Sequence, residues 1–168
     1  MSAYTGYLIR RERLRQNLSQ EGLAKGICAV SYLSKIEQGQ VEPGEEIVDR
    51  LFAALHIDFI RDPELEAEAA RQLDRFFFLA EADEPYEEQQ AFFDRHGERL
   101  MRSGFALCVQ VFRLICAARS AEDGRRVRAL LEGIEPFTEC LHTRARQWVL
   151  LVKAEVEDSR DGQWEAFD

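Results

Sequence analysis

The sequence predicts an all-α protein. Apolar residues recur with the 3.6-residue period of amphipathic helices through most of the chain. Capping residues and glycines stand where those periodic stretches begin and end. Charged residues make up 32% of the chain and hydrophobic residues 46%, which suits a helix-rich protein with a substantial core. A length of 168 residues can hold one domain, or a small domain and a second helical one.

The first predicted helix covers about residues 5–17, and two short helices joined by a tight turn follow it. Ser19 stands at the N-cap of the first short helix, and Gly26, which tolerates a positive φ, ends it. The second short helix covers about 30–38 and ends at Gly39. Helices this short are not stable alone because nucleation is costly, so they must pack on their neighbours.

These short helices carry the motif LSQEGLA…SYLSKIEQG, which is followed by a proline. The motif resembles the helix-turn-helix of lambda-repressor-like (XRE) DNA-binding domains over about residues 6–57. The resemblance implies a five-helix DNA-binding domain at 1–58. A turn one residue shorter than usual, between Leu23 and Leu33, resembles the peptide-pheromone-sensing (PlcR/NprR) branch. In that branch, tetratricopeptide-like (TPR-like) helical repeats follow the DNA-binding module.

The resemblance also implies which residues meet DNA. The helix at 30–38 is the expected recognition helix, and its polar side chains can bond base edges or phosphates in the major groove. The implied DNA-binding residues are Gln20, Val30, Ser31, Tyr32, Ser34, Lys35, Gln38 and Gln40. Arg13 and Glu37 are implied to form a structural ion pair. The alternatives are a solvated helix face that binds no nucleic acid, and two independent surface charges.

The formal charge is divided unevenly along the chain. The net charge is −9, but residues 1–40 contain six basic and three acidic residues, which gives +3. Residues 41–57 carry −3, and residues 58–168, with 15 basic and 24 acidic residues, carry −9. Because an acidic body repels phosphate, only the amino-terminal part should meet DNA, with modest and salt-sensitive affinity.

After a helix at about 44–55, Asp62-Pro63 gives an N-cap followed by proline at the first helical position, which predicts a second helical domain at 62–158. A polar tail, 159–168, is expected to be frayed, although Trp164 and Phe167 could dock on the domain. Further helices are predicted at about 63–82, 86–101, 104–118, 121–133 (capped by Ser120) and 136–158 (begun by Pro136).

Helical hairpins are the expected architecture of this second domain. Residues 104–136 resemble one TPR-like hairpin, and residues 63–101 resemble a degenerate one. A groove between the helices that carry Phe76–Phe78 and Phe92–Phe93 is a candidate site for a short peptide. Two hairpins are fewer than the three or so repeats that a stable concave groove needs.

No motif for catalysis or metal binding is present. The sequence has no glycine-rich phosphate loop, no H-E-x-x-H and no G-x-S-x-G, so it is not expected to be an enzyme or to need a cofactor. Its four cysteines lack C-x-x-C spacing and read as buried, reduced thiols, the alternative being a metal site at Cys140 and His142. His56 reads as a capping or surface residue.

No long uncharged apolar run and no apolar signal core occur, so no membrane span and a cytoplasmic location are expected. The sequence therefore predicts a transcriptional regulator that reads a palindromic operator on double-stranded DNA as a homodimer. The alternative is an interaction module that sequesters a partner regulator through its carboxyl-terminal helices, with peptide binding as a variant.

Overall fold

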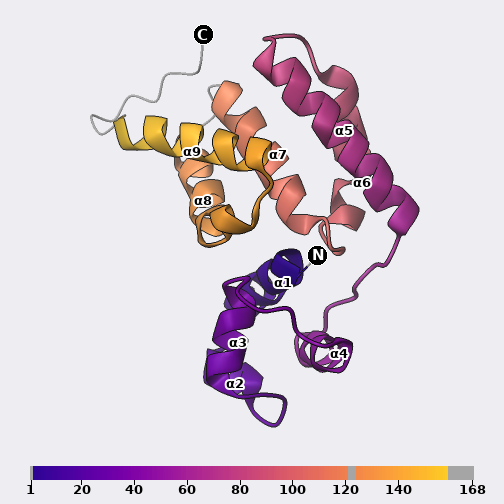
Figure 1. Cartoon of the computed structure of the whole chain (residues 1–168), viewed down its shortest axis with the longest axis vertical. Helices are drawn as coiled ribbons and strands as arrows, with labels where there is room; N and C mark the ends of the chain where they lie inside the picture. The colour runs from indigo at the N-terminus through magenta and orange to yellow at the C-terminus, as the bar shows by residue number, and fades with distance from the viewer. Residues whose placement is uncertain (1, 121–123, 159–168) are drawn as a thin grey trace.

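A computed structural model describes residues 2–120 and 124–158, which form nine α-helices and one 3-10 helix, with no strand among them (Figure 1). The all-α class is confirmed. Most helices lie within a few residues of their predicted bounds. In chain order they are α1 (Ser2–Arg15), α2 (Gln20–Ala24), α3 (Val30–Glu37), α4 (Glu45–Ala54), α5 (Pro63–Glu81), α6 (Glu87–Leu100), α7 (Ala106–Arg119), α8 (Gly124–Ile134), η1 (Glu135–Cys140) and α9 (Thr143–Asp158).

The predicted caps explain where several helices begin. The Ser19 hydroxyl accepts a hydrogen bond from the Gly22 amide at 2.9 Å at the start of α2. The Asp62 carboxylate accepts one from the Leu65 amide at 3.1 Å, and Pro63 occupies the first turn of α5. Ser120, expected to cap the helix at 121–133, is the C-cap of α7, and the residues that it would cap are not described. Residues 121–123 and the predicted tail 159–168, with Trp164 and Phe167, lie outside the described residues.

Two predictions about the helices are wrong in detail. The described residues up to 58 form four α-helices rather than five, because the next helix, α5, packs on α6. The helix predicted to run from Pro136 is broken into η1 and α9. Proline permits a helical start, but Leu141 is extended, at φ −75° and ψ 147°, and interrupts the chain before α9. This break allows Phe137 to be buried while α9 takes a new direction.

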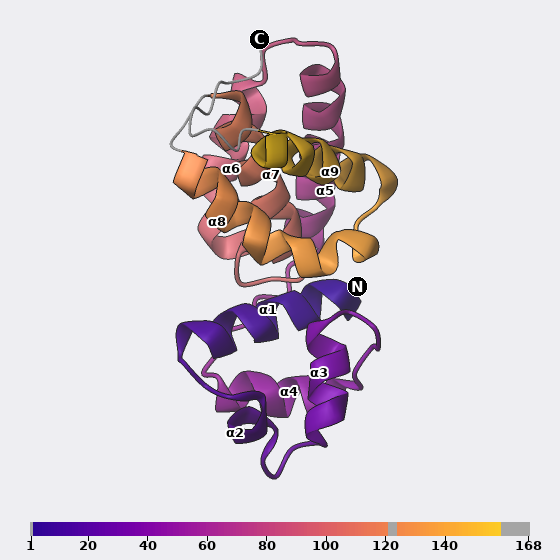
Figure 2. The ribbon, with the colours of Figure 1, turned by 90° about the vertical axis from the view of Figure 1, so that its left-hand side faces the viewer.

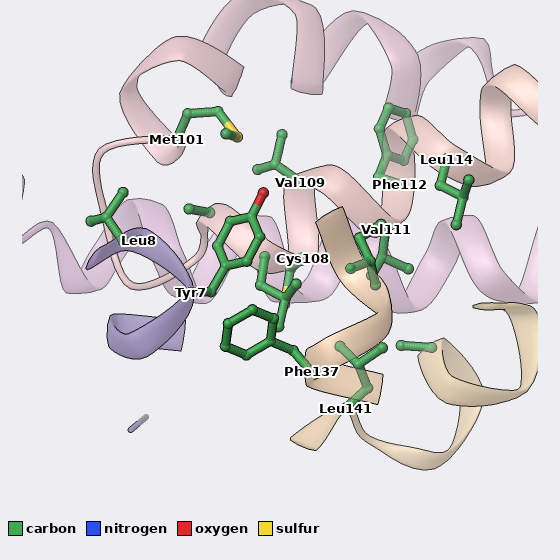
Figure 3. Close-up of a cluster of buried hydrophobic side chains, with 14 of the residues drawn as sticks. Tyr7, Leu8, Met101, Cys108, Val109, Val111, Phe112, Leu114, Phe137 and Leu141 are labelled. Carbon is green, nitrogen blue, oxygen red and sulfur yellow. The ribbon is translucent and has the colours of Figure 1, made fainter. Parts of the chain in front are cut away.

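The amino-terminal helices and the carboxyl-terminal helices share one core through α1. Figure 2 shows α1 between α2–α4 on one side and α7–α9 on the other, and α1 contacts α3, α4, α7 and η1. The Tyr7 ring meets Phe137 edge to face, with 5.3 Å between ring centroids, among Val109 and Cys108 (Figure 3). Burial raises the pKa of the Tyr7 phenol, which therefore stays neutral.

Aromatic rings fill the space between α5, α6 and α7. Phe76, Phe77 and Phe93 are buried. Phe112 of α7 contacts Phe76 and Phe93, with ring centroids 4.7 and 4.3 Å apart. These rings are core residues. Phe78 and Phe92, which the sequence also suggested for a peptide site, are 51% exposed and partly buried, respectively, and peptide binding there stays a prediction. Within the described part of the chain, no helix has the length and apolar character needed to cross a membrane.

Candidate nucleic-acid interface

The two short helices α2 and α3 contact each other and are joined by a turn at 25–29. Gly26 adopts φ +75°, a left-handed conformation that favours glycine. The Ile27 and Cys28 amides both donate to the Ala24 carbonyl, at 2.9 and 3.0 Å, and this closes the end of α2. The turn therefore sets the angle at which α3 leaves α2.

Arg50 of α4 holds this turn from outside. Its guanidinium Nη2 donates to the Gly26 carbonyl, although 24 residues separate the two in sequence. Nearby, burial raises the pKa of the Cys28 thiol, so this cysteine behaves as a small apolar side chain. Sequence reasoning missed Arg50 because no local pattern links a residue of α4 to a turn so far away in the chain.

A buried ion-pair network fastens α3 to α1. Arg13 Nε and Nη2 donate to the two Glu37 carboxylate oxygens at 2.6 and 2.8 Å, in a bidentate arrangement. Arg13 is 8% exposed and Glu37 is 1% exposed. Hydrogen bonding to Glu37 raises the pKa of Arg13, so its charge is permanent. The structure thus brings together the two residues expected to pair, in place of two independent surface charges.

Gln20, which was expected to contact DNA, belongs to the same network. Gln20 Nε2 donates to Glu37 Oε2 at 2.9 Å, so its amide already has a partner within the protein. Arg13 Nη1 also donates to the Leu18 carbonyl, at 2.7 Å. Together these bonds join the end of α1, the start of α2 and the end of α3. Gln20 is therefore placed to fix the geometry of the motif.

The other expected DNA-binding residues lie on or just beyond α3. Ser31, Lys35 and Gln38 are exposed and follow one another at helical spacing, so they share one face of the helix. Val30, at the start of α3, is 42% exposed. Tyr32 and Ser34 are partly buried, and Gln38 Nε2 donates to Ser34 Oγ at 3.3 Å. Gln40, beyond the end of α3, is exposed.

Most of α3 lies away from the carboxyl-terminal helices, and its end approaches η1 at the Gly39 carbonyl. In Figure 1, α2 and α3 lie at the end of the molecule opposite to α5–α9. Leu33 and Ile36, on the other face of α3, are fully buried. The helix thus has an apolar side held by α1 and α2 and a bare polar side that carries serine and lysine donors. Such a side can bond base edges or phosphates if the helix enters a major groove.

Comparison with known proteins bears on this part of the chain. Residues 9–60 match the family model described as HTH_3, helix-turn-helix. These residues are therefore similar to the helix-turn-helix domains of XRE-type regulators. The match supports a DNA-binding transcriptional regulator. A search of the curated proteins and a search of the solved structures each give no match.

The sequence left open a metal site at Cys140 and His142. In residues 2–120 and 124–158, no group of three or more His, Cys, Asp or Glu residues could hold a metal ion. The Cys140 Sγ lies 3.9 Å from the Gly39 carbonyl, just past the end of α3. The His142 ring instead packs against Phe77, with centroids 5.5 Å apart. His56 is exposed at φ +53°, just past the end of α4.

Proposed function

We propose that this protein is a sequence-specific transcriptional regulator that reads a palindromic operator as a homodimer through α3. The observation that carries the proposal is the bare face of Ser31, Lys35 and Gln38 within a helix-turn-helix domain. Lys35 would donate to guanine O6 and N7, and the serine hydroxyl would bond a base or a phosphate. Val30, at the start of the helix, would contact a thymine methyl group.

The composition of this face predicts modest affinity for each domain. The expected contacts include one lysine and no arginine, and the acidic carboxyl-terminal helices repel phosphate. Two domains on one palindrome would compensate, with half-sites about one helical turn, ~34 Å, apart. Because phosphate contacts release counterions, binding should weaken steeply as salt concentration rises.

Removing the α3 donors should weaken specific binding. We expect the double variant Ser31→Ala, Lys35→Ala to lose about 10- to 100-fold in affinity for its preferred duplex, since one good base contact contributes about 1–3 kcal/mol. The preferred sequence would be selected from a random duplex library with the wild-type chain. Fluorescence anisotropy at several salt concentrations would then give the affinity of each variant.

A charge-matched control separates specific contacts from net charge. Arg95→Ala removes one positive charge from an exposed position on α6, far along the chain from α3. This variant should bind the selected duplex like the wild type. Unchanged binding of the Ser31→Ala, Lys35→Ala protein at every salt concentration would show that α3 is not the reading helix.

The dimer contact is proposed to lie on α9. Leu150 and Leu151 are adjacent there and 46% and 45% exposed, and neighbouring exposed apolar side chains can form a protein–protein contact. The helix lies in the half of the molecule away from α2 and α3 (Figure 1), so pairing through it leaves both α3 faces uncovered.

Charges at this contact should separate the dimer. For Leu150→Glu, Leu151→Glu we expect sedimentation as a 19.4 kDa monomer, where the wild type sediments at twice that mass. The matched control is Phe78→Glu, at another exposed apolar position, on α5, and it should remain dimeric. A wild-type chain that is monomeric at the concentrations used for DNA binding would refute the dimer.

The second candidate function is an antagonist that sequesters a partner regulator through the carboxyl-terminal helices. The exposed Phe78, Leu150 and Leu151 on an acidic body favour it. A stoichiometric complex with a protein partner, together with no anisotropy change on DNA at low salt, would support this function over the first.

A relation to the peptide-pheromone-sensing branch, with TPR-like hairpins, stays a prediction. The pairwise packing of α5 on α6 and of α7 on α8 is compatible with two hairpins. The buried phenylalanines between α5, α6 and α7 weigh against a peptide groove at that position. Calorimetry with short candidate peptides would test whether any other part of these helices binds one.

A further inference from the structure

A cavity of about 390 Å³ opens where the helix-turn-helix domain meets the carboxyl-terminal helices. Its walls come from α1, the segment between α3 and α4, α4 itself, the connection from α4 to α5, the beginning of α5 and the loop before α7. The volume lies within the range of about 300–1,000 Å³ that is typical of small-molecule sites. None of the residues expected to meet DNA lines this cavity.

The floor of the cavity is apolar and includes an aromatic ring. Val48 of α4, Phe59 and Pro63 contribute to it. The Phe59 ring packs on Phe52, with 4.9 Å between centroids. The Arg61 guanidinium carbon lies 5.9 Å from the Phe59 centroid, so this ring already attracts one cation of the chain.

Carboxylates surround this apolar floor, and three of them lack a counter-charge. Glu42, Glu45 and Glu66 line the cavity and form no ion pair with any residue in 2–120 or 124–158. The other charges at the site are compensated, because Asp62 pairs with Arg99 at 2.9 Å and Arg61 pairs with Asp49 at 3.5 Å. The cavity therefore has an excess of negative charge.

Glu66 is the carboxylate best placed to act inside the cavity. It is partly buried, whereas Glu42 and Glu45 are exposed. A Cβ atom added to Gly104 would lie 3.8 Å from both Glu66 carboxylate oxygens. The carboxylate thus faces bare backbone at Gly104, and the absence of a side chain there leaves room beside it. Next to apolar walls, its attraction for a cation is stronger than it would be in water.

We propose that this cavity binds a small organic amine, with the ammonium group at Glu66 and the hydrocarbon part on Val48 and Phe59. Apolar walls alone would accept neutral molecules equally well, but the excess negative charge selects a cation and disfavours an anion. Because the walls come from both parts of the protein, the bound amine stabilises their observed arrangement and raises the melting temperature. The cavity would bind such a ligand whether or not α3 reads DNA.

Three probes that share a phenyl ring and a two-carbon chain test the selectivity on the full chain. Phenethylammonium, neutral 2-phenylethanol and anionic 3-phenylpropionate would each be titrated by isothermal calorimetry. We expect the amine to bind and the other two to bind at least tenfold more weakly. Equal affinity for all three probes, or no amine binding at millimolar concentration, would overturn the proposal.

Two variants and a matched control locate the site. Glu66→Gln keeps the shape of the side chain and should weaken amine binding about tenfold. Gly104→Leu should abolish it by filling the space beside Glu66, and a Cβ there makes only ordinary contact at 3.8 Å. Glu64→Gln removes an exposed carboxylate from the same first turn of α5, outside the cavity lining, and should bind the amine like the wild type. An equal effect of Glu64→Gln and Glu66→Gln would show that only net charge matters and would overturn the site.

Discussion

Gly6→Ala is expected to separate α1 from α3 and to destabilise the protein by about 3 kcal/mol or more, above the usual range for overpacking. A Cβ atom at this position would lie 1.9 Å from the Ile36 carbonyl oxygen and 2.9 Å from its carbon. Both atoms belong to the backbone of α3, so no side-chain rotation relieves the clash. The whole helix must move, and its exposed face moves with it.

Urea denaturation followed by circular dichroism would measure the loss of stability, and anisotropy with the selected duplex would measure the displacement of α3. The control is Gly133→Ala on α8, where an added Cβ meets no atom within 4 Å. That change should leave stability unaltered or raise it by up to about 1 kcal/mol, because alanine is the better helix former. If both variants were equally stable, the close approach of α1 and α3 would not exist in solution.

Local signals in the sequence were enough to predict most of the helices. Ser19 and Asp62 are N-caps whose side chains bond amides three residues later, and such bonds depend only on neighbours in the chain. The exposure of Ser31 and Lys35 also follows from helical periodicity once Leu33 and Ile36 are taken as buried. Whether these exposed residues touch DNA stays a prediction.

Features that depend on distant contacts could not be predicted in this way. The role of Gly6 depends on the Ile36 carbonyl, and that of Arg50 on the Gly26 carbonyl. The break between η1 and α9 is also not predicted by local sequence signals. Pro136 and the residues after it suit a continuous helix, but tertiary packing of Phe137 on Tyr7 favours a bend.

The use of Gln20 shows the same limit within the candidate site. The resemblance implied that Gln20 lies near a phosphate or a base edge, and in the structure its partly buried side chain donates to the Glu37 carboxylate. A sequence motif fixes which residues are present at a position, while the partner of each side chain depends on the three-dimensional arrangement. Replacing Arg13 or Glu37, the two charged residues of this network with Gln20, is therefore expected to have the second large effect on stability.

Arg13→Met is expected to lower the free energy of unfolding by about 3–5 kcal/mol, because it leaves the 1%-exposed Glu37 carboxylate without its cation. Glu37→Met should lower the free energy of unfolding by about as much, since it leaves the buried Arg13 guanidinium without its carboxylate partner. For a chain of this length, each kcal/mol lowers the melting temperature by roughly 2–4 °C. Calorimetric melting of both single variants would measure these losses.

The double variant Arg13→Met, Glu37→Met tests whether the ion pair adds net stability or only fixes the arrangement of α1 and α3. Desolvation of two charges offsets most of their attraction, so an apolar pair of similar length should cost less than either single change. Neither residue faces the proposed DNA surface, so the salt dependence of DNA binding should keep its wild-type slope in the folded double variant. Single-variant losses that simply add in the double variant would mean that the two charges do not act on each other across α1 and α3, despite the 2.6 Å contact between them.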